Sequence, residues 1–589
     1  MSFHVDTIPN RNSPPAILLR QAWREGKRIR RRTIANLSKL PPALIDGIRT
    51  VVRGGVAFPD LEAAVSIRRA LPHGHVAAIL GLARQLGLPR ILHRTASRDR
   101  DLALAAIAAR AFAPDSKLAT ARRLSPETAD SSLGPLLGLG HVHGNELLQM
   151  LDWLLNRQPW IEKSLANRHL KGGATLLYDV TSSYFEGRRC PLAHFGYSRD
   201  GKRHRKQMVF GLLCAADGSP VAVQVFPGNT ADPSTVADQV ATIRRRFGIE
   251  RVAFIGDRGM VTTARIREDL QPAGLDWVSA LNTRGIRKLL KTPGPDQLPP
   301  LRPGELLPDA VAETHSPDFP GERLLVCLNP RLREERARKR EDLLRDTETI
   351  LRDIAAAVQN KRLRGKDAIN RRVGRDANRK KVEKHFRIHV TDDQLTWTRR
   401  QDRIAAEAQL DGIYVVRTSL AAEALGNHAA VEAYKNLANV ERAFRSIKSL
   451  LQVRPVFVRT SAHVRAHVFL CMLAYYLQWN LRRRLAPLLL EDDDRDAARA
   501  ARSSPVQPAR VSEAAARKAN ARQTADGLPL HSFPTLLADL ATLTLNEVTL
   551  PGSPDAGFPL VARPTPLQQR AFQLLDIQPD NFVASTLAG

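Results

Sequence analysis

Residues 174–180 read Ala-Thr-Leu-Leu-Tyr-Asp-Val, a short apolar run with an aspartate, Asp179, near its end. Its length and apolar content are typical of a buried β-strand. Two more β-rich runs follow, at residues 208–214 and 221–226, and the Asp217-Gly218 pair between them is a strong hairpin-turn signal. The sequence therefore predicts three neighbouring strands, the first of which carries a carboxylate.

Helical and strand-like segments alternate after this hairpin. One of the strands is again followed at once by an acid, Asp257. The order predicts an α/β fold over residues 171–290, in which helices pack on a mixed sheet. The segments are a turn at 229–233, a helix at 234–246, a strand at 252–256, a helix at 261–270 and a strand at 277–281.

A third acid lies within a strongly basic part of the chain. Residues 434–484 carry ten basic side chains, and Glu441 is their only acid, which gives a net charge of +9. Their pattern predicts two helices separated by Pro455. A salt bridge from Glu441 to Arg445 would contribute ~0.2–0.5 kcal/mol. That interpretation leaves the two strand-end aspartates unexplained.

Helical spacing places Glu441 on one face with Tyr434, Arg445 and Lys448, at offsets of −7, +4 and +7. The neighbouring stripe is apolar, so it must pack on the sheet. The helix therefore presents a carboxylate flanked by cations beside its buried side. The stripe consists of Val440, Phe444, Ile447 and Leu451.

Asp179, Asp257 and Glu441 together favour a metal site. For a lone acid at a strand end, a turn or helix-cap role is the simpler interpretation. Three carboxylates brought together without metal would repel and raise one another's pKa values. Mg²⁺ or Mn²⁺ prefers such oxygen ligands. Two ions ~3.5–4 Å apart can act on both oxygens of an in-line phosphoryl displacement, so we expect two.

The whole chain is strongly basic, with 89 Lys and Arg against 60 Asp and Glu and a net charge of +29 over 589 residues. Such a field attracts polyanions, which makes a metabolic enzyme without such a partner a poor fit. Residues 468–477 form the longest apolar run, too short for the ~20 residues of a membrane span. The four cysteines form neither a disulfide framework nor a CxxC zinc site. With no secretory signal visible at residues 1–10, we expect a cytoplasmic protein.

The regions before the sheet are predicted to be mostly helical. Residues 1–170 contain periodic apolar segments that suit a DNA-binding or dimerisation domain, and equally a plain helical bundle. Residues 20–32 hold seven basic side chains and one acid, Glu25. Such a run is usually a solvated arm, and here it is also a candidate for phosphate contact.

The regions after residue 290 differ from the preceding sheet region in composition and charge pattern. Residues 291–410 are expected to be an insertion with β segments, in which residues 331–359 form a salt-bridged helix and residues 361–387 carry a net charge of +9. Residues 411–490 then return to the core. We expect residues 491–530 to be a disordered linker and residues 531–589 to be a tail.

These motifs resemble those of DDE transposases of the bacterial insertion-sequence type, in the branch with a Y-(2)-R-(3)-E-(6)-K signature. Tyr434, Glu441 and Lys448 match that signature in identity and spacing, whereas Leu437 stands at its Arg position. Lys435, Arg442 or Arg445 would have to compensate. The segments 178–187 (YDVTSSYFEG) and 255–260 (IGDRGM) resemble the two aspartate motifs of the family.

The resemblance implies a ribonuclease-H-like catalytic core. The two aspartates then lie on adjacent central strands, the glutamate comes from a later helix, and an insertion precedes that helix. It also implies that Asp179 and Asp257 hold one metal ion, and that one of them shares a second ion with Glu441. Tyr434, Lys448 and Arg258, with Arg442 and Arg445, are the expected DNA contacts.

The resemblance implies a transposase that binds double-stranded DNA. Water cuts the element end, and the freed 3′-hydroxyl attacks target DNA with no covalent protein intermediate. Action on two ends favours a homodimer in the synaptic complex, in a bacterial cytoplasm and on the nucleoid. Two alternatives remain: a catalytically silent, transposase-derived DNA-binding protein, and a covalent tyrosine or serine recombinase, for which Tyr178, Tyr184, Tyr197 or Tyr434 could serve as nucleophile.

Overall fold

The chain forms two compact units, which are described separately. The larger comprises His73–Leu543 and Pro564–Gly589, and the smaller Met1–Pro72 and Thr544–Arg563. The structure, a computed structural model, describes residues 2–11, 13–55, 65–170, 175–187, 189–291, 308–376, 382–492, 494–507, 511–550 and 553–581.

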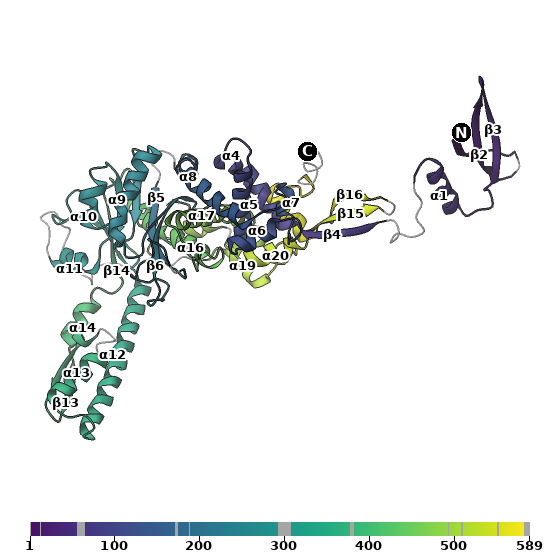
Figure 1. Ribbon diagram of the computed structural model, residues 1–589. Helices are drawn as coiled ribbons and strands as arrows, with labels where there is room; N and C mark the ends of the chain where they lie inside the picture. The colour runs from purple at the N-terminus through teal and green to yellow at the C-terminus, as the bar shows by residue number, and fades with distance from the viewer. Residues whose placement is uncertain are drawn as a thin grey trace. The chain divides into compact units, whose positions relative to one another are not determined.

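An eight-stranded mixed sheet forms the centre of the larger unit (Figure 1). Its order is β10-β11-β14-β9-β8-β5-β6-β7; β5 runs parallel to β8 and antiparallel to β6. The predicted α/β sheet is thus confirmed, including the β6–β7 hairpin, whose turn residue Gly218 has φ +90°. The strands are β5 Thr175–Tyr184, β6 Gln207–Ala215, β7 Pro220–Pro227, β8 Ala253–Gly256, β9 Asp276–Ala280, β10 Val311–Thr314, β11 Arg323–Leu328 and β14 Ile413–Thr418.

Helices from both ends of the chain pack around this sheet. The almost entirely buried α17 contacts β7, α5 and α8, and α16 contacts β5. The unit begins at His73, so no boundary separates the helices before residue 170 from the sheet. The helices before the sheet are α3 Gly74–Gln85, α4 Leu88–Leu92, α5 Arg98–Phe112, α6 Lys117–Leu124, α7 Leu133–Leu136 and α8 Gly144–His169. Those that follow are α9 Val236–Ala241, α10 Thr263–Arg265, α11 Thr283–Lys291, α15 Asn427–Lys435, α16 Leu437–Ser449 and α17 Ser461–Arg484.

The smaller unit is largely β-structure, so the helical prediction is wrong for its first 36 residues. Its arginine-rich strands carry charge on both faces, which hides the two-residue alternation that identifies a half-buried strand. Its sheets have the orders β1-β2-β3 and β16-β15-β4. Its elements are β1 Ser2–Ile8, β2 Ala16–Glu25, β3 Arg28–Asn36, α1 Pro42–Val52, β4 Ser66–Pro72, β15 Thr544–Leu550 and β16 Ser553–Val561.

An arm is inserted between β11 and β14 and extends away from the sheet (Figure 1). It has its own apolar core, in which Leu351 and Ile369 are fully buried. The predicted insertion over residues 291–410 is too long at its start, because β10 and β11 belong to the central sheet. The arm consists of α12 Pro330–Gln359, α13 Lys366–Asp376, β12 Phe386–Val390, β13 Leu395–Arg399 and α14 Gln401–Ala408.

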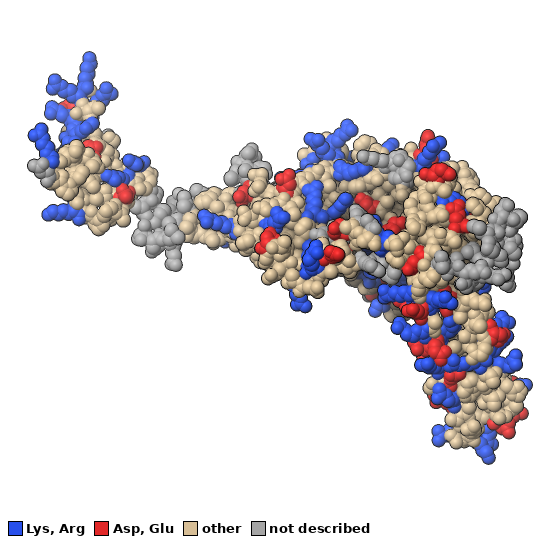
Figure 2. Space-filling view, turned by 180° about the vertical axis from the view of Figure 1, so that it is seen from behind, with Lys and Arg blue, Asp and Glu red and all other residues tan. Residues whose placement is uncertain are grey.

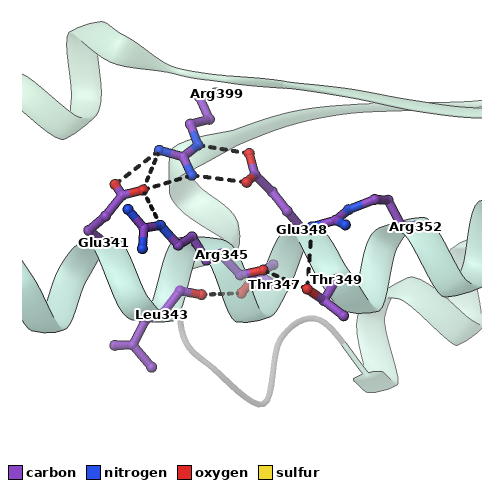
Figure 3. A network of polar contacts seen from close by, with 8 residues as sticks. All are labelled: Glu341, Leu343, Arg345, Thr347, Glu348, Thr349, Arg352 and Arg399. Carbon is purple, nitrogen blue, oxygen red and sulfur yellow. Dashed lines mark hydrogen bonds and ion pairs between the residues drawn. The ribbon is translucent and has the colours of Figure 1, made fainter.

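Ion pairs line α12, as its mixed charge indicated. Arg399 of β13 reaches across to Glu341 and Glu348 of α12, with its Nε 2.7 Å from Glu348 Oε1 and its Nη1 3.0 Å from Glu341 Oε2 (Figure 3). Arg345 donates to Glu341 one turn earlier, at 3.1 Å. One guanidinium therefore joins two turns of the helix to the hairpin.

The predicted linker at residues 491–530 is ordered where the structure describes it. Val506 is fully buried, and Lys435 donates to its carbonyl oxygen at 3.3 Å. Arg502 pairs with Glu432 at 3.2 Å. The prediction failed because the segment is anchored by a few residues on α15 rather than by an apolar face of its own. Three more helices follow β14 in this part of the unit: α18 Arg495–Ala500, α19 Glu513–Ala521 and α20 Phe533–Ala541; α21 Pro566–Leu575 comes after the strands of the smaller unit.

Within the described residues, no helix is long and apolar enough to cross a membrane.

Candidate active site

Asp179 and Asp257 lie next to each other because of the strand register. Asp257 follows the end of β8 as expected, whereas Asp179 lies within β5, which continues to Tyr184, so the prediction that Asp179 ends its strand is wrong. β5 and β8 are parallel neighbours, and Tyr178 pairs with Gly256. The residues that follow this pair, Asp179 in β5 and Asp257 after β8, therefore stand side by side where β8 ends. Adjacent strands are ~4.8 Å apart, so two carboxylates share this edge. Asp179 is half-buried and Asp257 is exposed.

Glu441 approaches this edge on α16. The apolar stripe of the helix packs on the sheet as its pattern predicted: Val440 and Ile447 are buried, and Phe444 meets Phe210 of β6 edge-on, with ring centroids 5.6 Å apart. Glu441 itself is exposed beside that stripe. The helix thus buries one side and holds a carboxylate at the rim of the sheet.

The pKa of Asp179 reflects the nearby charges. Burial raises it to about 7, and the negative charges of Asp257 and Glu441 contribute to the rise. The Val180 N–H, which donates to Asp179 at 2.7 Å, and the cation of Arg199 oppose it. Asp257 and Glu441 are therefore both close enough to Asp179 to influence its ionisation.

The donor set suits a hard divalent cation, although the side chains are not drawn together at ligand distance. Carboxylate oxygens are the ligands that Mg²⁺ and Mn²⁺ prefer. A bound cation would relieve the repulsion from Asp257 and Glu441, which adds to the effect of burial on the pKa of Asp179. Among the residues that the structure describes, no three His, Cys, Asp or Glu side chains form a group that could hold a metal ion.

Tyr434 contacts the second aspartate directly. Its hydroxyl donates to Asp257 Oδ1 at 3.2 Å. Burial raises the pKa of Tyr434, and the charge of Asp257 raises it further, so the hydroxyl keeps its proton and remains a donor. The helix is interrupted at Asn436, so Tyr434 lies in the last turn of α15 and Glu441 lies on α16. The prediction of one continuous helix face is therefore wrong.

Lys448, an expected phosphate contact, is held by an acid that sequence reasoning missed. Its Nζ lies 2.9 Å from Asp200 Oδ1, and Arg454 pairs with the same oxygen. Only 3% of the Asp200 side chain is exposed. Burial lowers the pKa of Lys448, and the hydrogen bond and negative charge of Asp200 partly offset this lowering. Asp200 lies in a basic loop between β5 and β6, and nothing in its local sequence predicts this pairing.

The other side chains expected to contact DNA differ in their exposure and in their contacts within the protein. Arg258 and Arg445 are exposed, and neither makes an ion pair within the described part of the chain. Arg442 is half-buried and donates to Asn439. Of the three proposed substitutes for the signature arginine, Lys435 is bound to the Val506 carbonyl, which leaves Arg445 as the most accessible.

A cavity of about 290 Å³ is lined by residues of the loops that follow β5, β7 and β8. Its wall includes Gly259, which comes two residues after Asp257, and Tyr197, which is 81% exposed. Arg199 also lines it, pairs with Asp232, and lowers the pKa of Asp179. The sequence placed Asp232 only in the predicted turn at residues 229–233, and nothing in the sequence pattern pointed to Arg199.

The family model described as the transposase DDE domain matches residues 171–477, which include Asp179, Asp257 and Glu441. Comparison with curated proteins gives no significant match. Among solved structures, the chain is similar to a piggyBac transposase in a synaptic complex with hairpin DNA: 10% identity, 69% of this chain and 72% of that chain covered, and a TM-score of 0.31. That likeness is too slight to carry an argument.

Proposed function

Because the chain belongs to the transposase DDE domain family, we propose that it binds the ends of an insertion sequence, cleaves them and joins their 3′ ends to target DNA. The observation that supports this most directly is the register that sets Asp179 beside Asp257, with Glu441 in the same electrostatic field. The strand order β7-β6-β5-β8-β9, with a later glutamate helix, is consistent with a ribonuclease-H-like core.

Asp179, Asp257 and Glu441 would hold two divalent ions, Mg²⁺ or Mn²⁺. When bound, such ions stabilise the attacking and leaving oxygens of a phosphoryl transfer. Tyr434 orients the Asp257 carboxylate through its hydrogen bond. The exposed guanidinium groups of Arg258 and Arg445 bind the DNA phosphates. No side chain becomes covalently attached to DNA in this scheme.

The partner is double-stranded DNA at two element ends, which favours a homodimer in the synaptic complex. The proposed setting is the bacterial cytoplasm, on the nucleoid. The net charge of +29 supports a polyanionic partner.

Metal dependence tests this proposal. With an end-labelled duplex that carries the sequence flanking its gene, the protein is expected to cut in Mg²⁺ and to be inactive in EDTA, while it binds the duplex in both. Cleavage is followed on denaturing gels and binding by fluorescence anisotropy. A catalytically silent binder would hold DNA equally well in EDTA and never cut. A tyrosine or serine recombinase would leave protein attached to the DNA after denaturation.

Tyr434→Phe is expected to slow single-turnover cleavage about 10- to 100-fold. A hydrogen bond to a charged group contributes about 1.5–3 kcal/mol, and the Tyr434 hydroxyl donates such a bond to Asp257. Tyr476→Phe is the matched control, because the Tyr476 hydroxyl contacts Arg168 and His169 instead. Equal cleavage rates for the two variants would remove the positioning role of Tyr434.

A further inference from the structure

The smaller unit carries a ribbon of two strands that projects beyond its third strand. β1 pairs with β2 only between Ala16 and Ala22. β2 and β3 stay paired as far as Glu25 and Arg28, and Gly26 in their turn has φ +58°. Every residue from 24 to 32 is exposed. Residues 24–32, called the ribbon below, therefore present both faces to solvent.

The ribbon is one of the densest concentrations of positive charge in the described chain. Six of its nine residues are Lys or Arg and one is acidic, a net charge of +5. Glu25 is paired with Arg30 at 2.9 Å. Lys27, Arg28 and Arg31 make no ion pair with any residue that the structure describes. Figure 2 shows the Lys and Arg side chains crowding the hairpin end of this unit.

The charges occupy both faces of the ribbon. The strand register puts Arg31 opposite Ala22 and Ile29 opposite Arg24 on one face. Arg28, Arg30 and Arg32 alternate with these residues and share the other face, each about 6.7 Å from the next. Like charges at such spacing repel, and a lone two-stranded hairpin is marginally stable in water. An anionic partner would relieve that repulsion along its whole length.

We propose that this ribbon lies in the major groove of duplex DNA. The groove is about 12 Å wide and admits a two-stranded β-ribbon, whose side chains then face phosphates on both walls. Ile29, 68% exposed, offers an apolar contact to base edges among these cations. The inference rests on the proposed function only in taking DNA as the partner, because the ribbon contains none of the proposed catalytic residues.

The test compares two triple variants of the full chain. K27Q/R28Q/R31Q neutralises the unpaired cations of the ribbon, and R333Q/R338Q/K339Q neutralises three exposed cations of α12. Binding to a fluorescein-labelled 40-bp duplex of mixed sequence is measured by anisotropy in EDTA from 50 to 250 mM KCl. Methyl green, which occupies the major groove, is added as a competitor.

The ribbon variant is expected to bind at least about tenfold more weakly, and its slope of log K against log[salt] is expected to fall by about 2–3. Methyl green should weaken DNA binding by the parent chain more than DNA binding by the ribbon variant. The α12 variant should keep the parent affinity and slope. An unchanged slope in the ribbon variant, or an equal loss in the α12 variant, would overturn the proposal.

Competition by the minor-groove ligand netropsin in place of methyl green would also contradict it. Thermal unfolding followed by circular dichroism checks that both variants fold as the parent does, which is expected because all six positions are exposed. Since binding is read in EDTA, absence of strand cleavage in Mg²⁺ would count against the proposed function and leave the ribbon result intact.

Discussion

Asp179→Asn is expected to lower strand cleavage in Mg²⁺ by about three orders of magnitude or more. The substitution keeps the shape of the side chain and removes its charge, and several kcal/mol of transition-state stabilisation depend on the cations that such carboxylates hold. Binding to the same duplex should persist or tighten, because a carboxylate that repels phosphate has been removed. Cleavage is measured with saturating protein on end-labelled duplex, and binding in EDTA.

Asp238→Asn serves as the control for this variant. Asp238 is an exposed aspartate on α9 whose carboxylate accepts from Gln224 at 3.0 Å, and it has no part in the proposed site. The Asp238→Asn variant should cleave the duplex at the rate of the parent chain. Full cleavage by Asp179→Asn would remove the central claim, whereas loss of both cleavage and binding would point to a structural role for Asp179.

Arg417→Met is expected to destabilise the larger unit by about 3–5 kcal/mol. Arg417 of β14 forms a two-point ion pair with Glu322, and about 5% of either side chain is exposed. It also donates to Thr263 at 3.3 Å and lies over the ring of Phe319, with its guanidinium carbon 5.1 Å from the centroid. Removing the cation strands a buried carboxylate, which is what makes such a loss large.

The double variant R417M/E322L separates this explanation from a loss of packing. Replacing both members of a buried ion pair by apolar residues is often neutral or stabilising, so the double variant should recover most of the stability that Arg417→Met loses. Urea unfolding followed by circular dichroism, together with hydrogen exchange of the β9 and β14 amides, measures both. A double variant no more stable than the single one would show that packing of the Arg417 stem dominates.

The central strands could be predicted from the sequence because their signals are local. The strands at residues 208–214 and 221–226 are short apolar runs around an Asp-Gly turn, and β6 and β7 form there. The place of β11 was missed, because joining a sheet edge depends on distant partners such as β14. The arginine-rich strands β2 and β3 of the smaller unit were missed because charge on both faces hides the two-residue alternation.

The same distinction holds for the site. Asp179 and Asp257 were found because each follows a short apolar run, and the register sets them side by side, although β5 continues past Asp179 to Tyr184. Their catalytic role stays a prediction. Asp200 and Arg199 were missed, since their contacts with Lys448 and Asp232 join residues far apart in the chain. A break of one residue at Asn436 also moved Tyr434 to another helix, which helical periodicity cannot reveal.

The arm leaves and rejoins the sheet at one hydrogen-bonded step. Leu328 of β11 pairs with Ile413 of β14, and the Asn329 N–H donates to the Gly412 carbonyl at 2.9 Å, so its two feet are adjacent. A tight turn could close the same gap without disturbing the strands on either side. The arm can therefore be lengthened, shortened or replaced in evolution without changing the strand register that aligns Asp179 and Asp257.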